Sequence, residues 1–281
     1  MQWRIEHLVK KHNQRKVNRS KPTVSTTANE LASSEGSAEE MADIEETASQ
    51  LRFMEPCEGS MNIIQQGWIK TITIRNSIRQ MDDPEAKISE MFKRFPILGA
   101  FDGNLINLDF NHLFPGSADA ANRWNDIQHK ILQCFKHHAS IENEFIRAVV
   151  FVKENNPTRG VKRTHDGSKE IRTTLDRIVE WISPEDNVDD YVNKVKSSKQ
   201  IFLLVKASPY KNGESYVVVG KRCFYVGFEI EAAFFTFLKV FKFLNVPVEP
   251  SLKNFFALFD GAIFQTGALT TTGTTFMVKL G

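Results

Sequence analysis

The sequence predicts an α+β protein that is predominantly α-helical, and three observations support this class. Apolar residues recur at helical spacing through the middle of the chain and again near its end. Three short runs rich in β-branched and aromatic residues, at 201–207, 215–220 and 223–227, are typical of strands, and Asn212-Gly213 is a hairpin signal. A phenylalanine-rich segment, 228–246, follows directly. We therefore expect a helical middle region and a C-terminal three-stranded antiparallel meander packed on helices.

Composition and charge narrow the functional classes only slightly. The 281 residues carry a net charge of +2, so no global field favours nucleic acid or a membrane surface. Three scattered cysteines without a CxxC pair argue against a disulfide framework and fit a reducing compartment. The N-terminus lacks the apolar run of a signal peptide. We expect an intracellular protein, in the nucleus or the cytoplasm.

Residues 1–58 are predicted to form a disordered arm that is first basic and then acidic. Residues 1–21 contain seven Lys and Arg against one Glu, and residues 22–58 contain nine acidic residues against one Arg. Few large apolar residues interrupt this stretch, which is rich in Ser, Thr and Ala. Burial therefore cannot offset the entropy lost when the arm becomes ordered.

Residues 59–157 are predicted to form a helical domain. Asp83-Pro84-Glu85 is a helix start, and apolar residues follow on one face until Pro96 ends the helix. The alternating residues 101–110 predict a short extended element. Ser117 is expected to cap the next helix, and residues 141–154 continue helically.

A polar, basic stretch at 158–170 is predicted to link this domain to a small α+β domain at 171–265. That domain should open with a helix across 171–182 and a second one after Ser183, before the meander. Ser251 is expected to cap a last helix. The threonine-rich residues 266–281 are predicted to be a disordered tail.

The phenylalanine-rich segment 228–246 has two interpretations. As a helix it would be about 28 Å long, close to the thickness of a bilayer core. Each of its four charged residues would cost up to ~3 kcal/mol near the bilayer centre, which cancels the gain from its apolar residues. These charged residues are Glu229, Glu231, Lys239 and Lys242. A helix that is apolar on nearly every side is also what the centre of a domain requires, so we expect a core helix and no membrane span.

Two longer stretches carry a resemblance to a known group of proteins. They are "IFLLVKASPYKNGESYVVVGKRCFYV" with "EAAFFTFLKVFKFLNVPVEPSLKNFFALFDGAIF", and the upstream "IRQMDDPEAKISEMFKRFPILG". The pattern resembles a large, diverse set of uncharacterised animal proteins that often occur in transposon-rich genomes, and it covers residues 60–265. The resemblance implies a mobile-element-associated or lineage-expanded gene. It offers no agreed activity and no catalytic residues, and the threonine-rich tail departs from it.

Two clusters of polar residues are candidates for metal chemistry. Cys134, His137 and His138 in QCFKHH could supply soft ligands from one helix end, although zinc would need a fourth ligand. A two-metal nuclease would need carboxylates that converge from separate elements. The candidate carboxylates are Asp102, Asp109, Glu185, Asp186, Asp189 and Asp190. The last four lie at a predicted helix start, where acidic residues favour the macrodipole, so we expect neither a metal site nor a cofactor.

Two basic patches could contact phosphates and give salt-sensitive, non-specific binding of nucleic acid. The first is the N-terminal arm with Lys10, Lys11, Arg15 and Lys16. The second is the linker, whose basic residues include Arg159, Lys162 and Arg163. Such charge runs are more often solvated, and the linker lacks the interleaved aromatic residues of single-strand binders.

The motifs of common enzymes are missing from the sequence. It contains no GxSxG, no GxxxxGK[ST] and no GxGxxG between a strand and a helix. We therefore expect a non-enzymatic module that binds an unidentified protein partner. The alternative is a nuclear protein that binds nucleic acid through the two basic patches, and an enzyme of unrecognised type comes third. The oligomeric state stays open.

Overall fold

This computed structural model describes residues 29–134, 138–157, 175, 178–194 and 201–281. The chain divides into two compact units, Met1–Asp43 and Ile44–Gly281. Helix α2 (Asn29–Phe53) contributes its second half to the second unit. The arm predicted to be disordered is therefore helical over these residues, and residues 1–28 lie outside the description. Apolar spacing explains the helix, because Ile44, Ala48 and Leu51 lie on one face and are buried in the core.

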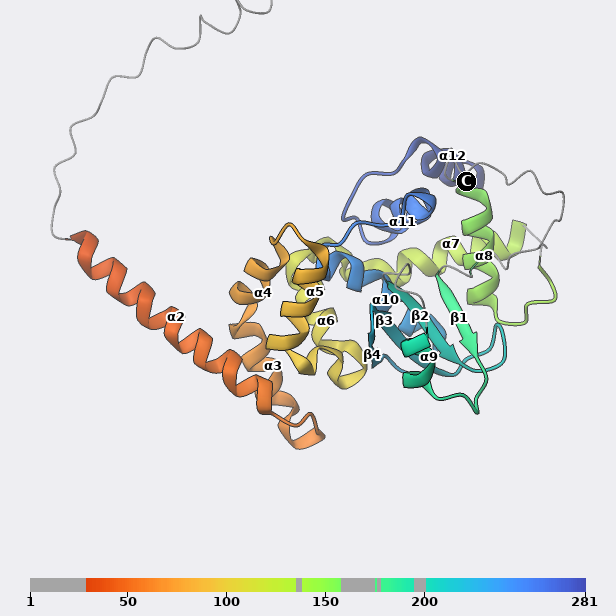
Figure 1. The fold of residues 1–281 in the computed structure, drawn as a ribbon. Helices are drawn as coiled ribbons and strands as arrows, with labels where there is room; N and C mark the ends of the chain where they lie inside the picture. The colour runs from red at the N-terminus through yellow and green to blue at the C-terminus, as the bar shows by residue number, and fades with distance from the viewer. Residues whose placement is uncertain (1–28, 135–137, 158–174, 176–177, 195–200) are drawn as a thin grey trace, which may run out of the picture. The chain divides into compact units, whose positions relative to one another are not determined.

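Helices and short 3-10 turns dominate the next hundred residues, as predicted (Figure 1). Their order is η1 (Glu58–Ser60), α3 (Met61–Lys70), α4 (Ile72–Arg79), α5 (Pro84–Arg94), η2 (Pro96–Gly99), α6 (Ala100–Leu113), η3 (Pro115–Asp119), α7 (Ala120–Cys134) and α8 (Glu144–Asn155). The predicted start of α5 is confirmed: Asp83 Oδ1 accepts a hydrogen bond from Glu85 N at 3.0 Å, and Pro84 is the first helical residue.

Residues 101–110 form part of helix α6, so the extended element predicted there is wrong. Three consecutive residues at its start, Phe101, Asp102 and Gly103, adopt left-handed backbone angles. This turn redirects the chain into the helix, whose Leu105, Ile106 and Phe110 are then buried. The alternation in the sequence was misleading because both polar and apolar positions of α6 contact other elements.

The capping residue predicted for α7 is also wrong. Ser117 lies within η3, and its hydroxyl donates to Phe114 O at 2.7 Å instead of accepting from a helix N–H. The apolar stripe of α7 is confirmed, since Trp124, Ile127 and Ile131 are buried.

The sheet contains four strands in the order β1 (Val179–Ile182), β2 (Ile201–Lys206), β3 (Glu214–Val219) and β4 (Arg222–Tyr225). The predicted antiparallel meander is confirmed as β2-β3-β4, while β1 adds a strand parallel to β2, with Val179 beside Leu203. The described part of 171–182 is thus a turn and a strand, not the predicted helix. Valine, tryptophan and isoleucine in β1 suit a buried sheet edge as well as a helix face.

Both faces of the sheet are covered, which explains why β2 is apolar at successive positions. Helix α9 (Val188–Lys194) packs with Phe202 and Leu204 on one face. The opposite face, with Leu203 and Val205, joins the main core. The Ser183 signal marks a turn rather than a cap, because α9 begins after Asn187, whose Oδ1 accepts from Asp190 N at 3.0 Å.

The phenylalanine-rich segment forms helix α10 (Ile230–Leu244), and the predicted core helix is confirmed. Phe234, Phe237, Phe241 and Phe243 are buried, and the rings of the first three contact Phe255 or Phe256 of the next α-helix. The chain continues through η4 (Pro250–Leu252), α11 (Lys253–Leu258), the π-helical turn η5 (Phe259–Ile263) and α12 (Thr271–Leu280). Within the described residues, no helix combines the length and the apolar character that crossing a membrane requires.

Two expectations about the C-terminal end are wrong. Ser251 caps no helix, since its hydroxyl donates to Glu249 Oε1 at 2.6 Å. The tail predicted to be disordered contains α12, whose N-cap Thr270 accepts from Gly273 N at 3.2 Å. Threonine disfavours helix interiors, but Phe276 and Leu280 are buried and tie α12 to the core.

The helical region and the sheet share one hydrophobic core from Ile44 to Leu280. The predicted linker at 158–170 lies outside the described residues. On either side of it, the two segments that the sequence separates into domains belong to a single compact unit. The close approach of η2 to β4 illustrates this packing, because a Cβ atom on Gly99 would lie 2.3 Å from Phe224 Cβ.

Candidate interaction surfaces

The soft-ligand cluster is only partly within the described residues. Cys134 is the last residue of α7, and His137 lies outside the description. His138 adopts a left-handed backbone angle, and its Nε2 is 2.8 Å from Glu154 Oε2. In the described ranges, no three His, Cys, Asp or Glu side chains are placed to hold a metal ion.

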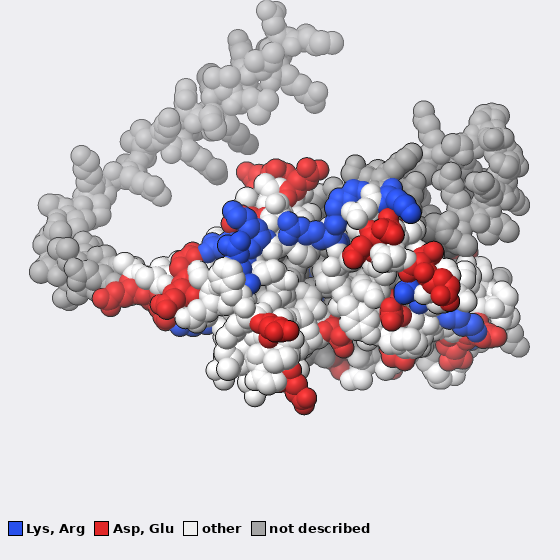
Figure 2. Space-filling model, turned by 60° about the horizontal axis from the view of Figure 1, so that its bottom comes forward, with Lys and Arg blue, Asp and Glu red and all other residues white. Residues whose placement is uncertain are grey.

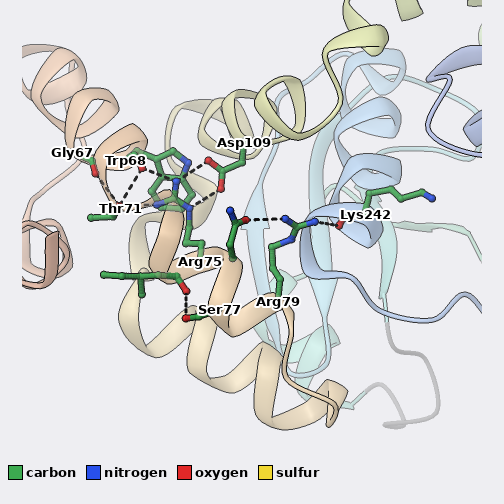
Figure 3. A network of polar contacts seen from close by, with 10 residues as sticks. Gly67, Trp68, Thr71, Arg75, Ser77, Arg79, Asp109 and Lys242 are labelled. Atoms are coloured by element: carbon green, nitrogen blue, oxygen red, sulfur yellow. Dashed lines mark hydrogen bonds and ion pairs between the residues drawn. The ribbon is translucent and has the colours of Figure 1, made fainter. Parts of the chain in front are cut away.

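Asp109 belongs to a buried polar network that joins α3, α4 and α6 (Figure 3). Its two carboxylate oxygens accept from Arg75 Nε at 2.6 Å and Arg75 Nη2 at 2.7 Å. Arg75 also donates to Trp68 O and Thr71 Oγ1, and its guanidinium carbon lies 3.8 Å from the Trp68 ring centroid. Both members of the pair are buried. Asp109 is therefore a structural residue with its acceptors occupied, and it is not available to a metal ion.

The other carboxylates do not converge on Asp109. Asp102 is exposed at the left-handed turn before α6. Glu185 and Asp186 are exposed in the turn before α9, while Asp189 and Asp190 occupy its first helical turn. The convergence of carboxylates that a two-metal nuclease would need is thus not assembled among these side chains.

The two predicted basic patches, 1–21 and the linker, lie outside the described residues and stay predictions. On the face shown in Figure 2, other Lys and Arg side chains form a band, with carboxylates beside it. Because acidic side chains lie beside these basic ones, the band does not produce the uniformly positive electrostatic field that attracts a polyanion.

An apolar surface lies on α2 and α3. Three large side chains are more than half exposed there: Phe53 at 83%, Ile63 at 57% and Ile69 at 57%. Met54 adds a partly buried thioether between the two helices. Of these, Ile63 and Met54 line the groove described next, whereas Phe53 and Ile69 do not. We call this groove, with Ile63 and Met54, the α2–α3 surface. An exposed group of large apolar side chains in a protein with a complete core is typical of a binding surface.

A groove of about 240 Å³ runs between the two helices. Leu51 and Met54 line it from α2, and Ile63 and Gly67 line it from α3. Gly67 brings the helices close, since a Cβ atom at this position would lie 3.1 Å from Leu51 Cδ2. The groove is therefore narrow and apolar at its floor, which suits one or two aliphatic side chains.

Carboxylates surround the α2–α3 surface. Gln50 lines the groove and donates to Glu46 Oε1 at 3.3 Å, which places that carboxylate at the rim. Glu55 and Glu58 are exposed just beyond Met54. The nearby Arg52 lies over its neighbour, with its guanidinium carbon 5.6 Å from the Phe53 ring centroid. Lys70 of α3 lines the groove itself, so the surroundings carry both signs of charge, with three carboxylates and two basic side chains.

Comparison with known proteins identified no family model, no curated protein and no solved structure that matches this chain. The resemblance to uncharacterised animal proteins stays a prediction.

Sequence reasoning did not identify the α2–α3 surface. The segment around Ile63 and Ile69 satisfies both strand and helix patterns, and Phe53 falls in a stretch predicted to be disordered. The only local signal was Gly67 within an apolar helix, which is typical of a close helix contact.

Proposed function

We propose that this protein is a non-enzymatic interaction module that binds a partner protein through the α2–α3 surface. The observation that carries the proposal is the exposed Ile63 at a groove that Leu51 and Met54 also line, with exposed Phe53 and Ile69 on the same two helices. Covering each such side chain contributes roughly 1.5–3 kcal/mol when burial is complete. Ile63 is the exposed anchor at the groove, and Leu51 and Met54 supply apolar surface for a side chain of the partner.

The occupant that fits best is an amphipathic helical segment of another protein. A groove between two helices accepts apolar residues at i, i+3 or i+4 spacing from a third helix. Its volume of about 240 Å³ limits the buried part to one or two aliphatic anchors.

The three carboxylates around the groove favour a segment that carries basic residues. Glu46, Glu55 and Glu58 would repel an acidic partner and attract Lys or Arg beside the apolar anchors. Such rim charges change the association rate and its salt dependence more than they change the final affinity.

The test compares the wild-type chain with Ile63→Glu. Segments captured from cell extract by cross-linking are synthesised as peptides, and their Kd is measured by fluorescence anisotropy. We expect an apolar, Lys- or Arg-containing helical peptide whose Kd rises about tenfold or more in Ile63→Glu, the effect of ~1.4 kcal/mol. Val278→Glu, which changes an exposed valine on α12, should bind like wild type.

Two outcomes would contradict the proposal. Capture and peptide affinity that are unchanged in Ile63→Glu would remove the α2–α3 surface from binding. A wild-type dimer in sedimentation velocity that becomes a monomer in Ile63→Glu would show that the occupant is a second copy of this chain.

A further inference from the structure

A second groove follows the free edge of the sheet. Strand β4 is the last in the strand order, so the described strands pair with it on one side only. Three consecutive residues of β4, Arg222, Cys223 and Phe224, line one groove of about 570 Å³. Successive strand residues point to opposite faces of a sheet. A groove that touches all three must therefore pass along the edge, and we call it the β4-edge groove.

The two walls of the β4-edge groove come from different elements. One wall is formed by Phe92 of α5 and by Pro96 and Gly99 of η2. The other is formed by Asp189 and Val192 of α9. The walls lie on opposite faces of the sheet. Val192 of α9 packs in the same cluster as Cys223, whereas Phe92 belongs to the main core on the other face, with Phe224.

Arg222 is held in place but keeps its hydrogen-bond donors available. Its guanidinium carbon lies 5.1 Å from the ring centroid of Phe92, and that ring contacts Phe224 at 6.2 Å between centroids. The residue is exposed, and among the described residues no carboxylate or carbonyl accepts from its guanidinium. An arginine stacked on an aromatic ring presents its donors in a fixed plane that matches a carboxylate.

Asp189 is the complementary group on the opposite wall. Among the described residues its side chain meets the Cys223 thiol, at 4.0 Å between Sγ and Oδ1, which is a weak interaction. Burial, together with the charge of Asp189, raises the pKa of Cys223 and keeps that thiol protonated. The other cation of the groove, Lys221, donates to Asn193 O at 2.8 Å and so holds the end of α9. The groove therefore combines Asp189 on the α9 wall with the available donors of Arg222 on β4, while Lys221 is engaged by the end of α9.

We propose that the β4-edge groove binds an extended peptide segment of a partner protein, which pairs with β4 and places an acidic side chain on Arg222. Side chains of an added strand alternate between the two faces, so the residue next to the acidic one would point toward Asp189. A lysine or arginine fits there. The expected ligand is thus an extended peptide with an acidic and a basic residue side by side.

The charges favour such a peptide over nucleic acid. A phosphate backbone carries one sign of charge along its whole length, and Asp189 would face it without compensation. The edge of β4 also supplies main-chain donors and acceptors, which pair with a peptide strand. This inference is independent of the α2–α3 surface, because it concerns a different groove and a partner of different chemistry.

The experiment selects short random peptides displayed on phage with the full wild-type chain, and removes those that also bind Arg222→Glu. Enriched peptides are synthesised and their Kd is measured by fluorescence anisotropy. We expect adjacent acidic and basic residues, and a Kd that rises about tenfold or more in Arg222→Glu, as for loss of a charge-assisted pair. Replacing the acidic residue of the peptide by lysine should restore binding to Arg222→Glu.

Matched controls separate this result from a general charge effect. Lys93→Glu changes an exposed lysine next to Phe92 that does not line the groove, and it should bind the peptides like wild type. Ile63→Glu should also bind them normally, which distinguishes failure here from failure of the α2–α3 surface. Circular dichroism confirms folding, and Arg222→Gln serves as a second variant if Arg222→Glu does not fold.

Either of two results would overturn the inference. One is a selection in which every enriched peptide binds Arg222→Glu as well as wild type, or in which none is enriched. The other is binding of single-stranded DNA of roughly 20 nucleotides with a steep salt dependence that Arg222→Glu and Lys93→Glu both weaken. That result would assign the face to nucleic acid.

Discussion

At the scale of single residues, two lysines of α10 show how local surroundings set the effect of a charge. Lys239 Nζ donates to Asn107 Oδ1 at 2.7 Å and lies 5.5 Å from the Phe110 ring centroid, and no carboxylate of the described residues pairs with it. Burial lowers the pKa of Lys239 to about 8. Lys242, one turn later, pairs with Asp260 Oδ2 at 3.0 Å. The first charge is therefore a cost to the fold, and the second offsets a buried carboxylate.

This contrast predicts opposite effects of the same substitution. Because the folded pKa of Lys239 lies below the unfolded value of about 10.4, the unfolded state binds more protons between these values. The free energy of unfolding should therefore rise as pH increases from about 8 to about 10.4. Lys239→Met should stabilise the protein by about 1–3 kcal/mol at pH near 7 and by less at pH near 10. Urea unfolding at the two pH values measures this.

Lys242→Met provides the comparison. Removing its ammonium leaves Asp260 without its ion-pair partner, and burial already raises the pKa of that carboxyl. We expect a loss of stability at neutral pH. Equal effects of the two substitutions would show that burial and pairing do not distinguish these lysines.

At the scale of elements, the left-handed turn at the start of α6 decides where that helix lies. Gly103 has φ +78°, and a Cβ atom there would lie 2.7 Å from Thr236 Cγ2 on α10. Asp102 has φ 55° but is exposed, so its cost is conformational only. The turn thus contains one position that requires glycine and one that merely tolerates another residue.

The two positions should respond in opposite directions. Gly103→Ala should destabilise the protein by about 1–3 kcal/mol, through backbone strain and the contact with Thr236. Asp102→Gly should be neutral or stabilising by up to about 1 kcal/mol, because glycine adopts left-handed angles without a steric cost. Thermal unfolding of both variants beside wild type is the measurement. A Gly103→Ala protein as stable as wild type would contradict the described turn.

At the scale of the whole molecule, the C-terminal helix closes the core that the rest of the chain builds. Phe276 and Leu280 of α12 are buried, and the Phe276 ring centroid lies 6.1 Å from that of Phe151 on α8. Lys130 Nζ also donates to Gly281 O at 2.7 Å. Residues of α7 and α8, which lie far from α12 in the sequence, therefore contact the C-terminal end of the chain and are partly covered by it.

Truncation after residue 265 tests this dependence. Removing α12 loses the burial of Phe276 and Leu280. At 1.5–3 kcal/mol for each buried side chain, the free energy of unfolding should fall by roughly 3–6 kcal/mol. The melting temperature should fall, and the truncated chain should bind a dye for exposed apolar surface. A loose tail, as the composition suggested, would leave both readouts unchanged.

The sequence by itself determined the elements whose signals are local and mutually consistent. Asp83-Pro84 started a helix, β2-β3-β4 formed the expected meander, and the phenylalanine-rich segment became a buried helix. In each case capping chemistry, strand propensity or all-round apolarity indicates the same structure as the tertiary contacts do. Helix α10 is buried because most of its side chains are apolar and would be unfavourable in contact with water.

Only the tertiary structure decided the elements and surfaces that depend on distant residues. β1 is a strand because β2 pairs with it, α12 is a helix because the core receives Phe276, and α6 begins where Gly103 fits against Thr236. The exposure of Ile63 and the stacking of Arg222 on Phe92 have the same origin. Whether a side chain is covered is a property of the packed assembly, and local sequence does not specify its neighbours.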